Sequence, residues 1–131
     1  MDIFWASIPV ALLVTAILQA NNLRDFDEDI EENKYTLVTL FGSSVGFWTY
    51  VALVFGAYLS ICINVLNTVV PWHSLLALCS LPWAFILVRR LRTAETRLVF
   101  NTILIGTARL HLYTGVLLAL GIVLYTMINA D

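Results

Sequence analysis

Four long apolar runs dominate the pattern of hydrophobic and polar positions along the chain. They cover about residues 3–20, 45–66, 69–88 and 110–128. A helix needs about 20 apolar residues to cross the hydrocarbon of a bilayer, and each run is close to that length. None alternates polar and apolar residues as the strands of a membrane barrel do. The pattern therefore predicts an all-α, polytopic transmembrane helix bundle with four spans, forming one domain over residues 1–131.

The connections between the predicted spans differ in length. Only Asn67 and Thr68 separate the second run from the third, which predicts a tight turn. Residues 89–109 join the third run to the fourth and contain a shorter apolar piece, residues 98–105. Because this piece is too short to span the bilayer, we expect it to lie along the interface or against the bundle.

Prolines and small residues inside the apolar runs indicate how the spans bend and pack. Pro9 and Pro82 fall within two of them, where proline removes a backbone hydrogen bond and commonly kinks the helix. Small residues four positions apart predict close helix packing at two further places, Gly56 with Ser60 and Gly115 with Ala119.

Charged residues are few and are confined to the connections. The chain is 60% hydrophobic and 12% charged, a balance typical of membrane proteins. Asp2 stands where a cleaved secretory signal has basic residues, so we expect the first helix to be retained. With four spans, every cation falls on one side of the membrane, which the positive-inside rule assigns to the cytoplasm. We expect a multi-pass integral membrane protein, in the plasma membrane if the organism is a prokaryote. The acidic residues that follow the first span lie on the cytoplasmic side in this prediction, together with all the cations: Arg24, Lys34, Arg89, Arg90, Arg92, Arg97 and Arg109.

An acidic cluster follows the first predicted span, and we call residues 21–34 the acidic motif. Six of the eight residues from 25 to 32 are Asp or Glu. If the helix continues, Asn21, Asp25 and Asp29 share one face, because residues four apart stack on a helix. Carboxylate and amide oxygens suit Mg²⁺, which proteins often share with the phosphates of a substrate. A merely solvated charged loop is the alternative interpretation.

The residues in and after the acidic motif also occur in a characteristic order: Asn21-Asn22-Leu23-Arg24-Asp25, then Asp29, Lys34, Thr36, Leu37 and Gly42. This order resembles the second aspartate-rich motif of the UbiA superfamily, in particular that of the 1,4-dihydroxy-2-naphthoate prenyltransferases of menaquinone and phylloquinone biosynthesis. Residues 107–112, followed by Gly115, are similar to the start of that family's last helix. Two positions depart from the family pattern. Asn33 stands in place of a glycine, a mild change because asparagine also tolerates a left-handed conformation. Leu40 stands in place of a frequent basic residue, which removes a possible diphosphate partner.

The resemblance implies a site and a reaction. It implies that Asp25 and Asp29 coordinate Mg²⁺ holding an isoprenyl diphosphate, which ionises and alkylates an aromatic acceptor, 1,4-dihydroxy-2-naphthoate in quinone biosynthesis. Further substrate-binding candidates line or brace this site or head the last span: Asn21, Asn22, Arg24, Lys34, Arg109 and His111.

The resemblance also implies an incomplete enzyme. UbiA-type enzymes have about twice as many helices and a first aspartate-rich motif of NDxxD type, which this sequence lacks. The four spans then correspond to the last four helices of that fold. We expect a C-terminal half that needs an N-terminal half or partner helices and is inactive alone.

Two other functions are compatible with the residues. One is a non-catalytic membrane subunit or remnant whose acidic cytoplasmic loop binds a partner. The other is a small cation transporter with an acidic vestibule, although no acid or base lies within a predicted span, where ion-pathway residues usually occur. The sequence has no nucleophile triad, phosphate-binding glycine loop, zinc-ligand spacing or nucleic-acid-binding patch.

Overall fold

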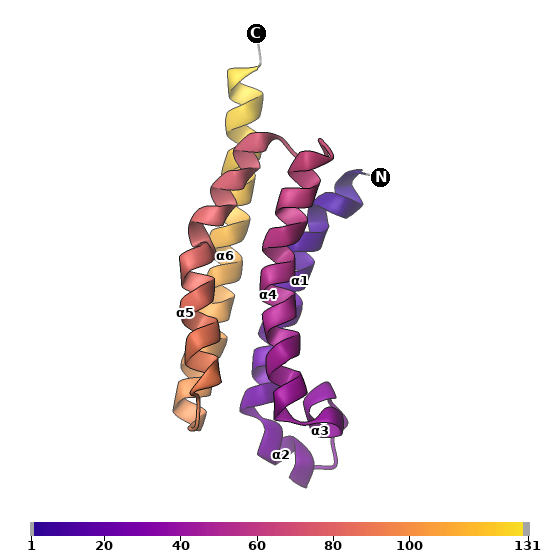
Figure 1. Ribbon diagram of the computed structural model, residues 1–131, viewed down its shortest axis with the longest axis vertical. Coiled ribbons are helices and arrows are strands. Elements are labelled where there is room, and N and C mark those ends of the chain that lie inside the picture. The colour runs from indigo at the N-terminus through magenta and orange to yellow at the C-terminus, as the bar shows by residue number, and fades with distance from the viewer. Residues whose placement is uncertain (1, 130–131) are drawn as a thin grey trace.

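The computed structural model describes residues 2–129 as a bundle of long helices that run up and down (Figure 1). Two short helices precede the second long one at one end of the bundle. The third crossing is a 3₁₀ segment that continues into an α-helix. In chain order the elements are α1 (Asp2–Arg24), α2 (Phe26–Glu31), α3 (Leu37–Phe41), α4 (Ser43–Leu66), η1 (Trp72–Ser80), α5 (Leu81–Arg92) and α6 (Arg97–Ile128).

Four segments are long and apolar enough to cross a membrane. Many of their large apolar side chains, among them Leu18, Leu59 and Leu112, face away from the bundle. Such a surface is stable against lipid or against further helices, and not in water. The predicted all-α transmembrane bundle is therefore confirmed, with these segments as its spans: Ile3–Arg24, Ser43–Leu66, Trp72–Arg92 and Arg97–Ile128.

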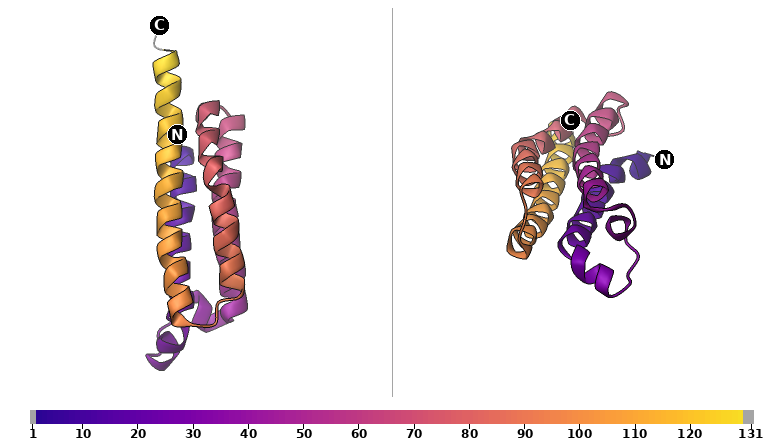
Figure 2. Two further views of the ribbon diagram at one scale, coloured as in Figure 1. Left: turned by 90° about the vertical axis from the view of Figure 1, so that its left-hand side faces the viewer. Right: turned by 60° about the horizontal axis from the view of Figure 1, so that its bottom comes forward.

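The helices associate as two neighbouring pairs. α1 packs along α4, and α6 packs along η1 and α5, while α1 also contacts α6 and so joins the pairs (Figure 1). The C-terminal end of α6 projects past the other helices, and residues 123–129 are exposed there (Figure 2). At the opposite end α2 continues past the end of α1 and α3 lies beside the start of α4, so the acidic motif sits at one end of the bundle (Figure 1).

Hydroxyl groups link the helices inside the bundle. Tyr50 of α4 and Thr107 of α6 are hydrogen-bonded at 2.8 Å. Tyr58 of α4 is bonded at 2.8 Å to Ser80, which is bonded at 2.8 Å to Thr114 of α6. No water reaches the hydrocarbon region, so these groups must satisfy one another, and each such bond stabilises a membrane bundle by about 0.6 kcal/mol.

The close helix contacts occur at other glycines than the sequence indicated. A Cβ atom on Gly46 would lie 2.8 Å from Leu23 Cδ2, and one on Gly121 would overlap the backbone of His73. A Cβ atom on Gly115 would meet no atom within 4 Å, and one on Gly56 would make only an ordinary contact. The predicted packing role of Gly115 is therefore wrong, because spacing alone does not say which face of a helix meets a neighbour. Gly56 does face Leu12 of α1, but the contact there leaves room for a Cβ atom.

Two expectations about the second half of the chain also need correction. Residues 98–105 do not form a separate interfacial piece, since α6 runs without a break from Arg97 to Ile128. The apolar run is interrupted in the sequence, but Ile103, Gly106 and Leu110 continue one buried face. Pro82 lies inside the third span, as predicted, but in the first turn of α5 just after the 3₁₀ segment, where proline is tolerated and replaces no interior residue of an α-helix.

Candidate functional site

The acidic motif is built where α1 passes into α2. The helix breaks at Asp25, which precedes the first residue of α2. Backbone hydrogen bonds nevertheless cross the break with helical spacing, from Asp25 N to Asn21 O at 3.0 Å and from Asp29 N to Asp25 O at 2.8 Å. The condition that the helix continues unbroken is thus not met, but Asn21 and Asp25 still lie one turn apart.

Asp25 is enclosed by hydrogen-bond donors. Arg24 donates from Nε to Asp25 Oδ1 and from Nη2 to Asp25 Oδ2, both at 2.7 Å. Asn21 Nδ2 donates to Oδ2 at 3.1 Å, and Asn21 Oδ1 accepts from Arg24 at 2.9 Å. The hydrogen bonds from Arg24 hold the pKa of Asp25 below its usual range, against the opposing effect of burial. Asp25 is therefore ionised at neutral pH and already paired with a cation.

The first turns of α6 also reach this site. Arg97 forms an ion pair with Glu28 and lies 3.5 Å from Asp25 Oδ1. Arg24 Nη1 donates to Asn101 Oδ1 at 3.4 Å. Asn101 was not among the predicted site residues, because residues 98–105 were expected to form a separate segment. A helix starting at Arg97 would have placed both residues on one face, four positions apart.

Asp29 differs from Asp25 in having a free oxygen. Its residue is 2% exposed, and Lys34 Nζ donates to its Oδ1 at 2.8 Å. This hydrogen bond raises the pKa of Lys34. The other oxygen, Oδ2, is buried and has no hydrogen-bond partner among the described residues. A buried carboxylate oxygen without a partner is unfavourable, so this position can accept a bound cation.

The turn after α2 brings Lys34 back to Asp29. Asn33 has a φ of +54°, in the left-handed region, and the backbone N–H of Lys34 donates to Asp29 O at 2.8 Å. Asparagine adopts this conformation more readily than most residues. The expectation that Asn33 can replace a glycine at this position is confirmed. Leu40, at the other departure from the family pattern, is exposed on α3 and adds no positive charge.

The donor set fits a Mg²⁺ ion that is shared with a ligand. Within residues 2–129 no three His, Cys, Asp or Glu side chains gather into a group that could hold a metal alone. Mg²⁺ usually takes one or two protein carboxylates and completes its shell with phosphate and water oxygens. The free Oδ2 of Asp29 fits such a role directly, whereas Asp25 can join only when Arg24 releases one of its oxygens.

The remaining predicted site residues lie apart from these contacts. Asn22 is half-buried on α1, and no hydrogen bond of its side chain is among those described. Arg109 is exposed 12 residues after the first residue of α6, about 18 Å along the helix axis. His111 lies two residues further along α6, and its buried Nδ1 has no described hydrogen-bond partner. Both residues were expected at the cytoplasmic entry of the last span. This is wrong, because α6 begins at Arg97 and both lie within the span Arg97–Ile128. Their roles toward a substrate stay predictions.

Gln19 holds α1 in place next to the site, a role that the sequence analysis did not predict. It is 5% exposed, and its Nε2 donates to Gly46 O at 3.0 Å, which fixes α1 against the start of α4. A polar residue two positions before Asn21, inside an apolar run, was the available signal.

Comparisons with known proteins identify the family of the chain. The profile of the UbiA prenyltransferase family matches residues 1–105, which include the whole acidic motif and end before residues 107–112. UbiA prenyltransferase domain-containing protein 1 is 36% identical over 118 residues in Gallus gallus and in Homo sapiens, covering 90% of this chain and 34% or 33% of the relative. The 2-carboxy-1,4-naphthoquinone phytyltransferase of Synechocystis is 29% identical over 117 residues, covering 88% of this chain and 38% of the relative.

No solved structure matches the chain. The chain spans about a third of the length of the curated relatives that it matches. Because the family profile covers most of its residues, the resemblance predicted from the acidic motif is confirmed at the level of the family. The chain belongs to the UbiA prenyltransferase family.

Proposed function

We propose that the chain forms part of a Mg²⁺-dependent enzyme that transfers an isoprenyl group from a prenyl diphosphate to an aromatic acceptor. Membership of a prenyltransferase family supports prenyl transfer in general. The observation that carries the assignment of the site is the buried, unpartnered Oδ2 of Asp29 beside the cluster of Asn21, Arg24 and Asp25. In this proposal Asp25 and Asp29 are the metal ligands.

The residues of the acidic motif prepare the site for a diphosphate. When bound, Mg²⁺ neutralises the charge that develops on the departing diphosphate. Arg24 and Arg97 hold Asp25 in the absence of substrate. Guanidinium groups bind phosphate oxygens with the same paired geometry, so an arriving diphosphate draws them away and frees the Asp25 oxygens. Lys34 orients Asp29 through its hydrogen bond to Oδ1.

The apolar spans have a separate task. The isoprenyl chain needs an apolar environment, and the allylic cation formed by loss of diphosphate must be shielded from water until the aromatic ring attacks it. The four spans provide apolar surfaces next to the acidic motif, at the end of the bundle where α1, α4 and α6 meet it. The positive-inside rule assigns this end to the cytoplasm.

We infer that the acceptor is 1,4-dihydroxy-2-naphthoate, in a pathway to a menaquinone-type quinone. The order of residues in the acidic motif and the name of the Synechocystis relative support a naphthoate-like acceptor. We also infer that further helices, from an N-terminal half or a partner chain, complete the enzyme. This inference is supported by the chain's coverage of only about a third of its relatives.

Prenyl transfer by the assembled enzyme tests the proposal. The full chain is expressed in membranes with and without the N-terminal part of the Gallus gallus relative that it lacks. Transfer from tritiated geranylgeranyl diphosphate to 1,4-dihydroxy-2-naphthoate is then measured with Mg²⁺ or EDTA. We expect transfer only in the combined membranes and only with Mg²⁺. Asp25→Asn and Asp29→Asn should lower it about 100-fold or more.

Glu31→Gln and Glu32→Gln are the matched controls, because both residues belong to the acidic motif but are exposed. Equal loss in all four variants would indicate a docking loop that needs only negative charge, and not a metal site. Asp29→Asn should also leave the thermal stability of the chain nearly unchanged, since asparagine can still accept the hydrogen bond of Lys34. A large loss of stability would mean that Asp29 serves the fold.

A further inference from the structure

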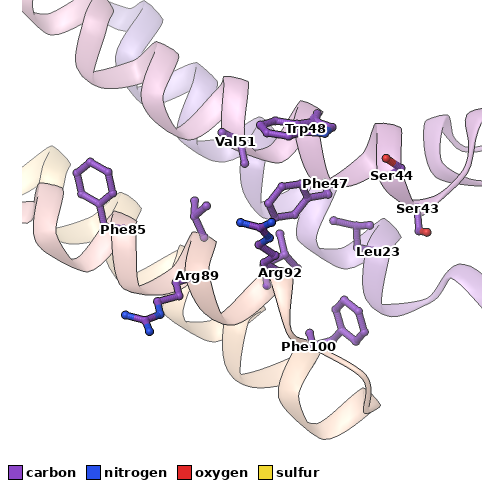
Figure 3. Close-up of a pocket in the computed structure, with 13 residues that line it drawn as sticks. Leu23, Ser43, Ser44, Phe47, Trp48, Val51, Phe85, Arg89, Arg92 and Phe100 are labelled. Carbon is purple, nitrogen blue, oxygen red and sulfur yellow. The ribbon is translucent and has the colours of Figure 1, made fainter.

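A cavity of about 960 Å³ lies between α4 and α5, near the end of the bundle that carries the acidic motif (Figure 3). Its wall is mostly apolar and rich in aromatic rings. Phe47, Trp48 and Val51 extend from α4, while Phe85 of α5 and Phe100 of α6 face the cavity from the other side. Such a wall accommodates a long hydrocarbon chain.

The rim of this cavity is positively charged. Arg89 and Arg92 of the last turn of α5 line it, together with the hydroxyl-bearing Ser43 and Ser44 at the start of α4. In Figure 3, Arg92 reaches toward Phe47 across the opening, while Arg89 extends along the outside of α5. None of the described residues that line the cavity is acidic.

The two arginines are also uncompensated. The ion pairs described within residues 2–129 all involve Arg24, Lys34 or Arg97. Arg89 and Arg92 have no such partner in this part of the chain. Since α5 forms the end of a membrane span, their positive charge lies at the edge of the bilayer, and the aromatic wall extends into the hydrocarbon.

An occupant of this cavity must join an anionic head to an apolar chain. Anionic phospholipids have this chemistry, are present in the surrounding bilayer, and are attracted to basic residues at its surface. We infer that the cavity binds an anionic phospholipid, with its phosphate at Arg92 and Arg89 and one acyl chain along Phe47, Trp48 and Phe85. This lipid site does not depend on the proposed prenyl transfer.

An isoprenyl diphosphate shares the same chemistry, a phosphate head on an apolar chain. The proposed diphosphate site, however, requires the carboxylates of the acidic motif, and these do not line the cavity. A phospholipid needs no metal, so a cationic rim without carboxylates favours the lipid.

Fluorescence quenching at Trp48 tests the lipid site. The full chain in detergent micelles is titrated with phosphatidylglycerol or phosphatidylcholine carrying brominated acyl chains, which quench a tryptophan on contact. The contribution of Trp48 is the difference between the chain and its Trp48→Phe variant. We expect half-maximal quenching at a much lower mole fraction of brominated phosphatidylglycerol than of brominated phosphatidylcholine.

Charge-removing variants locate the head group. Each arginine near a membrane surface contributes roughly fivefold to the binding of anionic lipid, so Arg89→Gln with Arg92→Gln should weaken quenching by phosphatidylglycerol roughly 30-fold. Arg90→Gln is the matched control, because Arg90 belongs to the same basic turn and is exposed but does not line the cavity. It should keep most of the preference, and circular dichroism checks that each variant remains folded.

Three outcomes would overturn the lipid site. The first is equal quenching by the two phospholipids, and the second is an equal loss in Arg90→Gln. The third concerns geranylgeranyl diphosphate added with Mg²⁺. If it displaces brominated phosphatidylglycerol completely from the unchanged chain but not from the Asp29→Asn variant, the cavity belongs to the prenyl substrate. Persistent quenching in the presence of that diphosphate supports the lipid, whether or not prenyl transfer is observed.

Discussion

Two polar regions of the bundle are bonded in different ways. In the interior, Tyr58, Ser80 and Thr114 bond to one another across α4, η1 and α6, so each hydroxyl has a partner. At the acidic motif, charged groups from α1, α2 and α6 also pair, but one buried oxygen of Asp29 is left without a described partner. The interior bonds serve the association of the helices, whereas the motif retains a free ligand atom.

This difference separates structure from function within one small chain. A polar group buried in a membrane protein is expensive unless it is bonded, so a closed network is explained by packing alone. The free oxygen of Asp29 gives no such benefit to the fold. The comparison therefore predicts that changes to the interior lower stability, while changes to Asp29 affect ligand binding.

Gly121→Ala should have the largest effect on the interior. The added methyl group would overlap the backbone of His73 and Ser74, which cannot move aside as a flexible side chain can. We expect α6 to separate from η1 at a cost of about 1–3 kcal/mol in unfolding free energy. Unfolding of the chain in mixed micelles, followed by circular dichroism, measures this loss. Gly115→Ala is the control and should be neutral or slightly stabilising, because open space surrounds Gly115; equal losses in both variants would contradict the described packing.

Tyr58→Phe should have a smaller effect on the same region. It removes the hydroxyl that bonds to Ser80 and keeps the aromatic ring, while Ser80 retains its bond to Thr114. We expect a loss of about 0.6 kcal/mol, and at most about 1.7 kcal/mol, as for other hydrogen bonds between membrane helices. The same unfolding experiment applies. Tyr113→Phe, on an exposed part of α6, is the control and should not change the unfolding free energy measurably. A loss as large as that of Tyr58→Phe would mean that the hydroxyl network does not stabilise the bundle.

The sequence was sufficient for the features that depend on local composition. Long apolar runs give the spans, and the six acids of residues 25–32 give the position of the polar end. The left-handed turn at Asn33 also follows from a property of a single residue. These inferences succeed because a span's length depends on the bilayer and a turn depends on a single residue, and neither depends on a distant part of the chain. Charge is the exception, since Arg109 lies within the span Arg97–Ile128.

Features that depend on contacts between distant residues could not be predicted in this way. Arg97 and Asn101 meet the acidic motif across about 70 residues of intervening chain. The continuity of α6 through Arg109 is visible only when Ile103 and Leu110 are seen to be buried on one side. Asp29 is likewise one of several neighbouring acids in the sequence. It differs from them by its burial and by its hydrogen bond from Lys34, and the order of residues reveals neither.

The pairing of Asp25 with Arg24 leads to the smallest predicted effect. The hydrogen bonds of Arg24 lower the pKa of Asp25, so the pair stabilises the fold above the ordinary Asp pKa, about 3.9. That stabilisation is lost as the pH falls through the lower pKa of the folded state. It is of the order of 1 kcal/mol or less, as for most ion pairs near a surface. Arg24→Gln should therefore raise the pKa of Asp25 toward its ordinary value, measured from the ¹³C shift of its carboxyl group, whereas Arg90→Gln should leave it unchanged. An unchanged pKa in Arg24→Gln would mean that Asp25 is not held by Arg24 in the membrane, and that its oxygens are as free for a metal as that of Asp29.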